Sequence, residues 1–236
     1  MTNEAMSDNA TRDDIEREYV EAMGPELGRV CAALYHDVVW LHMRWAMYRQ
    51  LFAKSDRRIA LLNDTAGMFF GFFQRVLFED IVLGLARLVD PCQSKGKDNL
   101  SLQRIQKLVK DPQIKSDIRT LTDAAVAACA SMRCWRNRRI AHRDLSLALA
   151  TAAEPLPGIS HTAIEEALCA VRDLLNRLEL HYCDRTIGYE HTITAPGDGD
   201  ALVYYLNDGL KATREREQRI RDGTYTAVDL APDDEV

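Results

Sequence analysis

Apolar side chains recur every three or four residues along most of this chain, a spacing that is typical of amphipathic helices. The recurrence covers residues 26–52, and it resumes over residues 56–89 until Asp90-Pro91 interrupts it. It returns over residues 113–132 and again over residues 162–182. Four long helices of this kind predict an all-α fold, an antiparallel helical bundle with four to five main helices.

Outside these helices the pattern is weaker. After Cys183 it becomes compatible with extended chain over residues 186–194, and residues 200–221 again have helical spacing. We therefore expect three parts, namely an N-terminal lead-in (1–24), the helical bundle (25–183), and a small C-terminal appendage with one helix and an acidic tail (184–236).

The longest apolar stretch, AGMFFGFF at residues 66–73, lies between Asp64 and Gln74. It is far shorter than the about 20 residues that a bilayer crossing needs. We therefore predict that it belongs to the core of the bundle and that the chain contacts no membrane.

Composition narrows the class of protein. The chain has 236 residues with 30 basic and 36 acidic side chains, and its net charge of -6 argues against a general nucleic-acid coat. Its 12 glycines, 7 prolines and few aromatic residues are not typical of an all-β sandwich. Six cysteines without a C-x-x-C pair, and a polar opening over residues 1–14, predict reduced thiols and a cytoplasmic location.

Positive charge is nevertheless concentrated between residues 133 and 143, which read RCWRNRRIAHR. This segment holds five arginines, a tryptophan and a histidine, and the next acid is Asp144. Arginine offers planar donors that match phosphate oxygens, and histidine moves protons near neutral pH. These two residue types are sufficient for metal-free cleavage of RNA. A solvated helix end is the other interpretation, because cations interact favourably with a helix C-terminus.

The segment from Arg136 to Asp144 resembles the signature of the HEPN superfamily (higher eukaryotes and prokaryotes nucleotide-binding domains), in which an arginine and a polar residue precede a histidine. Arg136, Asn137 and His142 fill those places. The segments LLNDTAGMFF (61–70), LARLVDP (85–91) and KDNLSL (97–102) are similar to the AbiU-like subgroup of abortive-infection proteins.

This resemblance implies a helical homodimer that brings two copies of the motif into one cleft, where many members of the superfamily cut RNA without a metal. It also implies the roles of three residues. His142 would transfer protons, Arg136 would stabilise the phosphate and the transition state, and Asn137 would orient the site.

The remaining residues of the segment are secondary candidates. The other arginines are expected to contact RNA phosphates, with solvated surface as the competing interpretation for at least one of them: Arg133, Arg138, Arg139 and Arg143. Asp144 either fixes the histidine tautomer, caps a turn or pairs with an arginine. Trp135 either stacks on a base or is buried in a dimer interface.

Helix geometry raises a question about the motif. Six residues at about 100° each place Arg136 and His142 roughly 120° apart on a straight helix. Either the helix ends or bends here, or the partners come from different subunits.

Other candidate sites have simpler explanations. His36 and His42 do not share a helix face as metal ligands would, and we expect no metal and no cofactor. Residues 197–200 (GDGD) lack the context of a dinucleotide loop and predict a turn. Arg87 and Asp90 are one helical turn apart and predict a structural salt bridge or a helix-end interaction.

The first hypothesis is a metal-independent endoribonuclease of a bacterial phage-defence or toxin type, whose products carry a 2′,3′-cyclic phosphate. The second is a non-catalytic dimer module that binds RNA or a nucleotide, or that partners an antitoxin or a nucleotidyltransferase. The third is a purely structural helical dimer.

Overall fold

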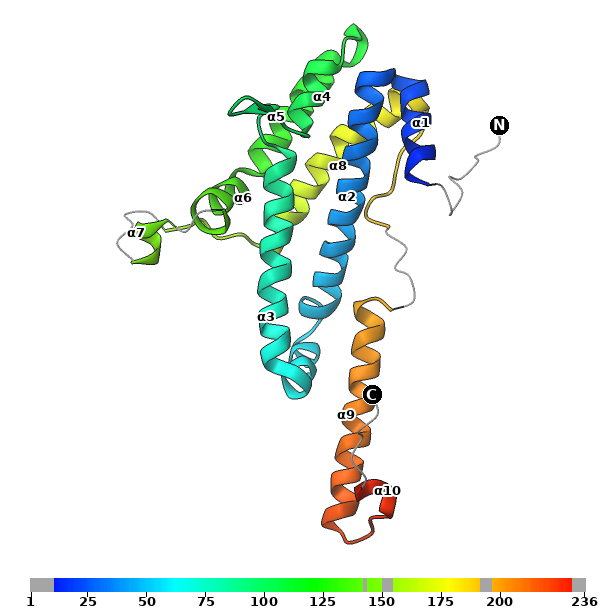
Figure 1. The fold of residues 1–236 in the computed structure, drawn as a ribbon, viewed down its shortest axis with the longest axis vertical. Helices are drawn as coiled ribbons and strands as arrows, with labels where there is room; N and C mark the ends of the chain where they lie inside the picture. The colour runs from blue at the N-terminus through cyan, green and yellow to red at the C-terminus, as the bar shows by residue number, and fades with distance from the viewer. Residues whose placement is uncertain (1–10, 142–143, 150–154, 192–196, 231–236) are drawn as a thin grey trace. The chain divides into compact units, whose positions relative to one another are not determined.

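The computed structural model describes residues 11–141, 144–149, 155–191 and 197–230 (Figure 1). The prediction of an all-α fold is confirmed, because the only strands in the described part of the chain are two residues long each. The elements are α1 (Arg12–Met23), α2 (Pro25–Phe52), α3 (Asp56–Leu88), β1 (Gln93–Ser94), β2 (Lys97–Asp98), α4 (Leu102–Leu108), α5 (Pro112–Ala128), α6 (Ala130–Trp135), the π-helical turn η1 (Arg136–Ile140), α7 (Leu145–Ala148), α8 (His161–Cys183), α9 (Gly199–Arg221) and α10 (Ala227–Leu230).

The chain folds as two compact units. The first unit comprises Met1–Trp45 and Phe78–Thr192, and the second comprises Ala46–Leu77 and Ile193–Val236. Both α2 and α3 therefore contribute to each unit. No helix in the described residues has the length and apolar character that a membrane crossing requires.

The first unit is an antiparallel bundle built on α2, α3, α5 and α8. Gly84 of α3 lies so close to Leu41 of α2 that an added Cβ would be 3.0 Å from the leucine Cδ1. Arg44, one turn further along α2, pairs with Asp80, one turn earlier in α3. The two helices therefore run in opposite directions.

Helix α8 contacts both α2 and α5. The indole nitrogen of Trp45 in α2 donates to Glu165 near the start of α8 at 2.7 Å. Near its other end, α8 contacts α5 through Arg177 and Asp117, whose Nε and Oδ2 atoms are 2.9 Å apart. Between the helices lies a fully buried core that includes Leu34, Leu41, Ile81, Leu85, Ile114, Ile118, Ile164 and Leu168.

Helix α1 is tied to this core by a buried polar network. The Tyr19 hydroxyl donates to Glu179, a carboxylate of α8 that is almost inaccessible to solvent. Arg185 also donates to Glu179, with its Nε 2.9 Å from Oε2. The opposite charge compensates for burying the carboxylate, so the N-terminal helix is part of the first unit's packing.

The apolar stretch over residues 66–73 is not the core segment that we expected. Phe70 is buried, whereas Met68, Phe69 and Phe72 are exposed. The backbone of α3 is also kinked at Ala66, where φ is -153° and ψ is 58°. Consecutive apolar residues point all round a helix, so one neighbouring helix cannot cover all of them.

Two further expectations need correction. The helix expected over residues 113–132 ends at Ala128, because Cys129 has φ -89° and ψ 9° and separates α5 from α6. The segment expected to be extended, residues 186–194, has no strand in its described part, which ends at residue 191. The rest of that segment lies outside the described residues.

In the second unit, the turn expected at residues 197–200 covers only residues 197 and 198, because α9 already begins at Gly199. The Asp198 side chain caps α9 by accepting a hydrogen bond from the backbone of Ala201 at 2.9 Å. Gly199 lies against Gln50, whose Oε1 accepts from the Gly199 backbone at 3.0 Å. An added Cβ here would be 3.0 Å from Gln50, which explains the glycine.

A buried histidine of α2 makes the stability of the fold depend on pH. Nδ1 of His42 is 2.9 Å from the carbonyl of Val38 and therefore carries the proton, while the buried Nε2 has no partner in the described residues. Burial lowers the pKa of His42 below its usual value of 6.5. The unfolded chain then binds the proton more tightly than the folded chain does.

We expect the free energy of unfolding to decrease as the pH falls below about 6.5, and to decrease less in His42→Gln, which cannot take up the proton. Urea unfolding of both proteins at about pH 7.5 and about pH 5 measures this. His36, whose pKa burial also lowers, is present in both proteins. Equal pH dependence of the two proteins would contradict the assignment.

Candidate functional site

The arginine-rich segment begins in a π-helical turn rather than in a regular helix. Helix α6 ends at Trp135, and η1 follows, in which the amide of Ala141 donates to the carbonyl of Arg136 at 2.8 Å. This bond spans five residues instead of four. Single π-helical turns are rare and occur frequently at functional sites. We expected that the helix either ends or bends at this segment, or that the catalytic partners come from different subunits. The structure shows that the helix changes pitch and ends here.

Arg136 is held by an acidic residue from the end of α3. Its Nη1 is 2.6 Å from Oδ1 of Asp90, and this carboxylate contacts it with both oxygens. Both side chains are less than one fifth exposed, at 19% and 18%. A charge-assisted pair of this kind is shorter and stronger than a neutral hydrogen bond.

Asn137 orients the same guanidinium from a second direction. Its Oδ1 accepts a hydrogen bond from Nε of Arg136 at 3.0 Å. Asp90 and Asn137 together engage Nη1 and Nε, and Nη2 of Arg136 has no hydrogen-bond partner in the described part of the chain. One edge of this planar cation thus keeps donors that an anion could use.

Of the two interactions expected between Arg87 and Asp90, the structure shows the helix-end interaction and not the salt bridge, because the amide of Asp90 donates to the carbonyl of Arg87 at 3.1 Å. Arg87 is exposed, and among the described residues no ion pair joins it to Asp90. The one-turn spacing assumed a continuous helix, but α3 ends at Leu88 and Asp90 lies in the turn beyond it. Its carboxylate reaches a residue 46 positions later in the chain.

Two other arginines of the segment also face carboxylates. Nε of Arg138 is 3.3 Å from Oδ2 of Asp144, and Nε of Arg139 is 3.3 Å from Oε1 of Glu79 in α3. Arg133 has a buried Nε without a hydrogen-bond partner in the described residues. The adjacent Asp144, together with Glu79 and Asp90 from distant parts of the sequence, therefore offsets much of the charge that the segment alone predicts.

Asp144 performs the two structural tasks that we considered for it. It caps α7 by accepting hydrogen bonds from the backbone of Ser146 at 2.9 Å and of Leu147 at 3.3 Å. The pKa of Asp144 is lowered, chiefly because the Ser146 hydroxyl donates to the carboxylate. Together with its contact to Arg138, this anchors the chain directly after His142 and Arg143.

Trp135 is held within the first unit. Its indole nitrogen donates to the carbonyl of Pro157 at 2.7 Å, and its ring meets Phe78 of α3 edge to face with centroids 5.8 Å apart. The guanidinium carbon of Arg139 lies 5.0 Å from its ring centroid. Arg139 covers one face of this ring, so a base that stacks on that face would have to displace it.

His142 and Arg143 lie outside the residues that the structure describes. The structure therefore brings together Arg136 and Asn137 of the proposed catalytic group, and adds Asp90 and Glu79, which sequence reasoning had not assigned to the site. In the sequence, the only sign that Asp90 has a special role is its position directly before the proline that follows the long helix.

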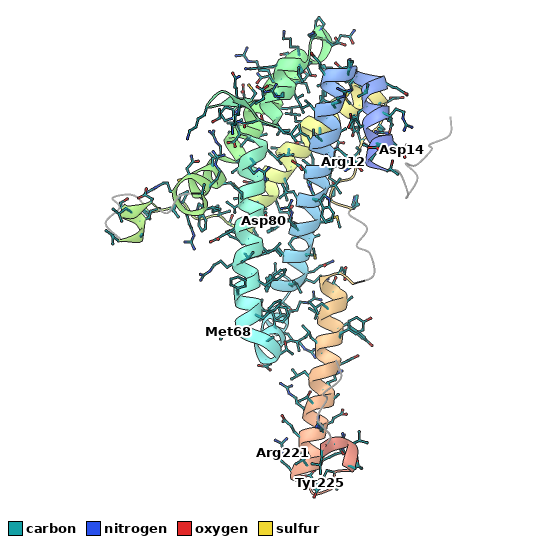
Figure 2. All side chains as sticks on the ribbon, in the orientation of Figure 1. Arg12, Asp14, Met68, Asp80, Arg221 and Tyr225 are labelled. Atoms are coloured by element: carbon teal, nitrogen blue, oxygen red, sulfur yellow. The ribbon has the colours of Figure 1, made fainter. Side chains whose placement is uncertain are left out.

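A hollow of about 170 Å³ opens beside this site, with Asp90 as part of its wall. Asp80, labelled in Figure 2, also lines it. Its other polar walls are Asp37, Arg44, Arg87 and Asn99.

The described residues contain no group of three or more histidine, cysteine or acidic side chains that could hold a metal. The six cysteines are free thiols. Cys129, close to the arginine segment, is fully buried, and burial raises its pKa to about 12. Its role is therefore core packing.

The family model HEPN_AbiU2, described as AbiU2, matches residues 24–196. That range includes Asp90 and the whole arginine-rich segment. No curated protein and no solved structure matches the chain.

Replacing Asp90 by asparagine would leave the charge of Arg136 in a mostly buried position without its counter-ion. We expect Asp90→Asn to lower the free energy of unfolding by about 1–3 kcal/mol. Urea denaturation measures this. The matched control is Asp98→Asn, because the mostly exposed Asp98 pairs with Arg104, and its loss should cost within about 0.5 kcal/mol. Equal effects of the two substitutions would contradict a special role for Asp90.

Proposed function

The chain belongs to the AbiU2 family of HEPN proteins, and from this premise we propose that it is an abortive-infection endoribonuclease that cuts RNA without a metal ion. HEPN domains often form dimers and bind RNA. The observation that carries the proposal is the guanidinium of Arg136, fixed by Asp90 and Asn137 with Nη2 left for an anion. Fixed donors of this kind stabilise a transition state because they need no reorganisation during the reaction.

The proposed reaction is an internal transesterification of RNA. A base removes the proton of the 2′-hydroxyl, the 2′-oxygen bonds to phosphorus, and the bond from phosphorus to the 5′-oxygen breaks as that oxygen is protonated. The products are a 2′,3′-cyclic phosphate and a 5′-hydroxyl. In our assignment Nη2 of Arg136 contacts a non-bridging phosphate oxygen, and His142 transfers a proton.

The charge distribution supports selective rather than general binding of RNA. The net charge of the protein is -6, and Glu79, Asp90 and Asp144 face three of the arginines of the segment. Bulk attraction to a polyanion is therefore weak. Binding then depends on the geometry of the few donors that remain, with Arg138 and Arg139 able to exchange a carboxylate for a phosphate.

A binding module without catalysis is the second candidate. The ion pairs of Arg138 with Asp144 and of Arg139 with Glu79 favour it, because such pairs are also common in proteins at sites where no catalysis takes place. It predicts that RNA or a nucleotide is bound and not cut, or that an antitoxin or nucleotidyltransferase covers the arginines.

Arg136→Lys separates chemistry from folding. Lysine keeps a cation for Asp90 but lacks the planar set of donors that Asn137 and a phosphate would share. We expect a folded protein that cuts RNA about 10²- to 10³-fold more slowly. His142→Ala should reduce cutting by about 10²- to 10⁴-fold. Rates are measured on mixed cellular RNA in EDTA, with end mapping of the products.

The control is Arg119→Ala, an exposed arginine of α5 away from the segment, which should leave the rate unchanged. If the wild-type protein binds RNA but cuts none, the second candidate replaces the first. If Arg136→Lys and His142→Ala both cut at the wild-type rate, the site assignment is wrong.

A further inference from the structure

The hollow beside Asp90 combines apolar walls with a polar rim. Leu41 of α2, Leu83 and Leu88 of α3, and Leu100 form its apolar walls. Its volume is about 170 Å³, and a cavity of about 150 Å³ is enough to hold one benzene ring. The hollow therefore has room for one flat ring system. Sites for small ligands have this character, with apolar walls and a few polar groups that fix the orientation of the ligand.

Two oppositely charged side chains line this hollow on facing helix turns. Leu41 of α2 lies against Gly84 of α3. Because the two helices are antiparallel, Asp37, one turn before Leu41, faces the turn of α3 that contains Arg87. Both charged side chains are exposed, and neither makes a hydrogen bond or an ion pair in the described residues. The hollow thus presents an unused acceptor group and an unused donor group together.

Asn99 adds a fixed acceptor to the same wall. Its side-chain nitrogen donates to the carbonyl of Pro91 at 2.7 Å. Its backbone is held as well, because its amide donates to the carbonyl of Cys92 at 2.9 Å and its carbonyl accepts from Nε of Arg104 at 3.1 Å. The side-chain oxygen of Asn99 therefore lies on the side away from Pro91. It accepts no hydrogen bond within the described residues, so its lone pairs remain for another donor.

Among the RNA bases, guanine is complementary to this rim. A carboxylate only accepts hydrogen bonds, and its two oxygens can take two parallel N–H donors. The Watson–Crick edge of guanine offers two neighbouring donors, N1–H and the 2-amino group, beside the O6 acceptor. In adenine and cytosine the amino group adjoins a ring nitrogen that accepts, and in uracil the single N–H lies between two carbonyls. A carboxylate would therefore meet an acceptor on each of these three bases.

The hollow shares a wall with the candidate phosphate site. Asp90 lines the hollow and also holds Nη1 of Arg136 with both carboxylate oxygens. A phosphate on Nη2 of Arg136 would therefore lie on the other side of this ion pair from the hollow. The base of an adjoining nucleotide is the part of an RNA strand that can reach into the hollow from there.

We propose that the hollow binds the base of a guanosine next to the phosphate held by Arg136, and that the protein thereby selects RNA that contains guanosine. Asp37 accepts from N1–H and the 2-amino group, Asn99 accepts the second amino hydrogen, and Arg87 donates to O6. This assignment rests on the proposed function, because it takes Arg136 to contact an RNA phosphate. Asp37 and Arg87 act in recognition, and no bond forms or breaks at either side chain.

The test measures binding of short RNA that the protein cannot cut. Fluorescently labelled pentamers carry fluorine in place of every 2′-hydroxyl, and UUGUU, UUAUU, UUCUU and UUUUU differ only in the central base. A fifth pentamer carries hypoxanthine there, which is guanine without the 2-amino group. By fluorescence anisotropy, the wild type should bind UUGUU about 10-fold or more tightly than the adenine, cytosine and uracil pentamers, because one bidentate contact discriminates by that much. The hypoxanthine pentamer should lie between them.

Asp37→Asn replaces one of the two acceptor oxygens by a donor. An asparagine side chain matches the amino donor and the ring-nitrogen acceptor of adenine. This variant should therefore bind UUAUU at least as tightly as UUGUU. Arg87→Gln should reduce the preference for UUGUU over UUUUU. Both residues are exposed, so both variants should stay folded by circular dichroism. Glu21→Gln removes the same charge from an exposed acid of α1 and should keep the wild-type preference.

Cleavage of mixed cellular RNA is measured separately on the same full-length protein. A chain that prefers UUGUU but cuts no RNA contradicts the proposed function and leaves the guanosine site in place. Equal binding of all pentamers, no binding of any pentamer, or an Asp37→Asn variant with the wild-type preference would overturn the guanosine site. So would free guanosine 5′-monophosphate that binds more tightly than UUGUU, because the hollow would then be a nucleotide site and not part of an RNA site.

Discussion

The ion pair between Asp90 and Arg136 is the interaction on which the rest of the site depends. It joins the turn after α3 to the first residue of η1, across 46 positions of sequence. It satisfies a mostly buried cation and, together with Asn137, fixes the plane of its guanidinium. Without the pair, the arginine would be either an uncompensated charge or a mobile side chain. The local order of the segment and the proposed chemistry therefore depend on the same ion pair.

The same principle explains how an acidic protein carries an arginine-rich site. Carboxylates from α3 and from the cap of α7 neutralise much of the segment, so the arginines can pack closely without strong mutual repulsion. The π-helical turn changes their spacing relative to a regular helix. In the proposed function, long-range attraction to RNA is therefore reduced, and recognition would depend on short-range geometry. A site of this kind tolerates the presence of other polyanions better than a bare basic patch does.

The sequence predicted the all-α fold and the family because both have strong local signals. Regular apolar spacing located α2 over Pro25–Phe52 and α8 over His161–Cys183, each within a residue or two. The prediction that residues 66–73 belong to the core was wrong, because a run of consecutive apolar residues has no periodicity that indicates which helix face is covered. The partners of Asp90 and Glu79 could not be read from spacing, since both pairs join distant segments. The π-helical turn η1 could not be predicted either, because its amino-acid composition does not differ from that of an ordinary helix end.

In the proposed reaction, the 2′-hydroxyl of RNA attacks the phosphate, assisted by residues of the protein and no metal. The most direct measurement uses a short RNA with one mapped cut site and its twin with a single 2′-deoxy residue immediately 5′ to the cut, both in EDTA. We expect the all-RNA strand to be cut to a 2′,3′-cyclic phosphate and a 5′-hydroxyl, while the twin stays intact at that site. Cleavage of the twin at the same position, or cleavage that stops in EDTA, would contradict it.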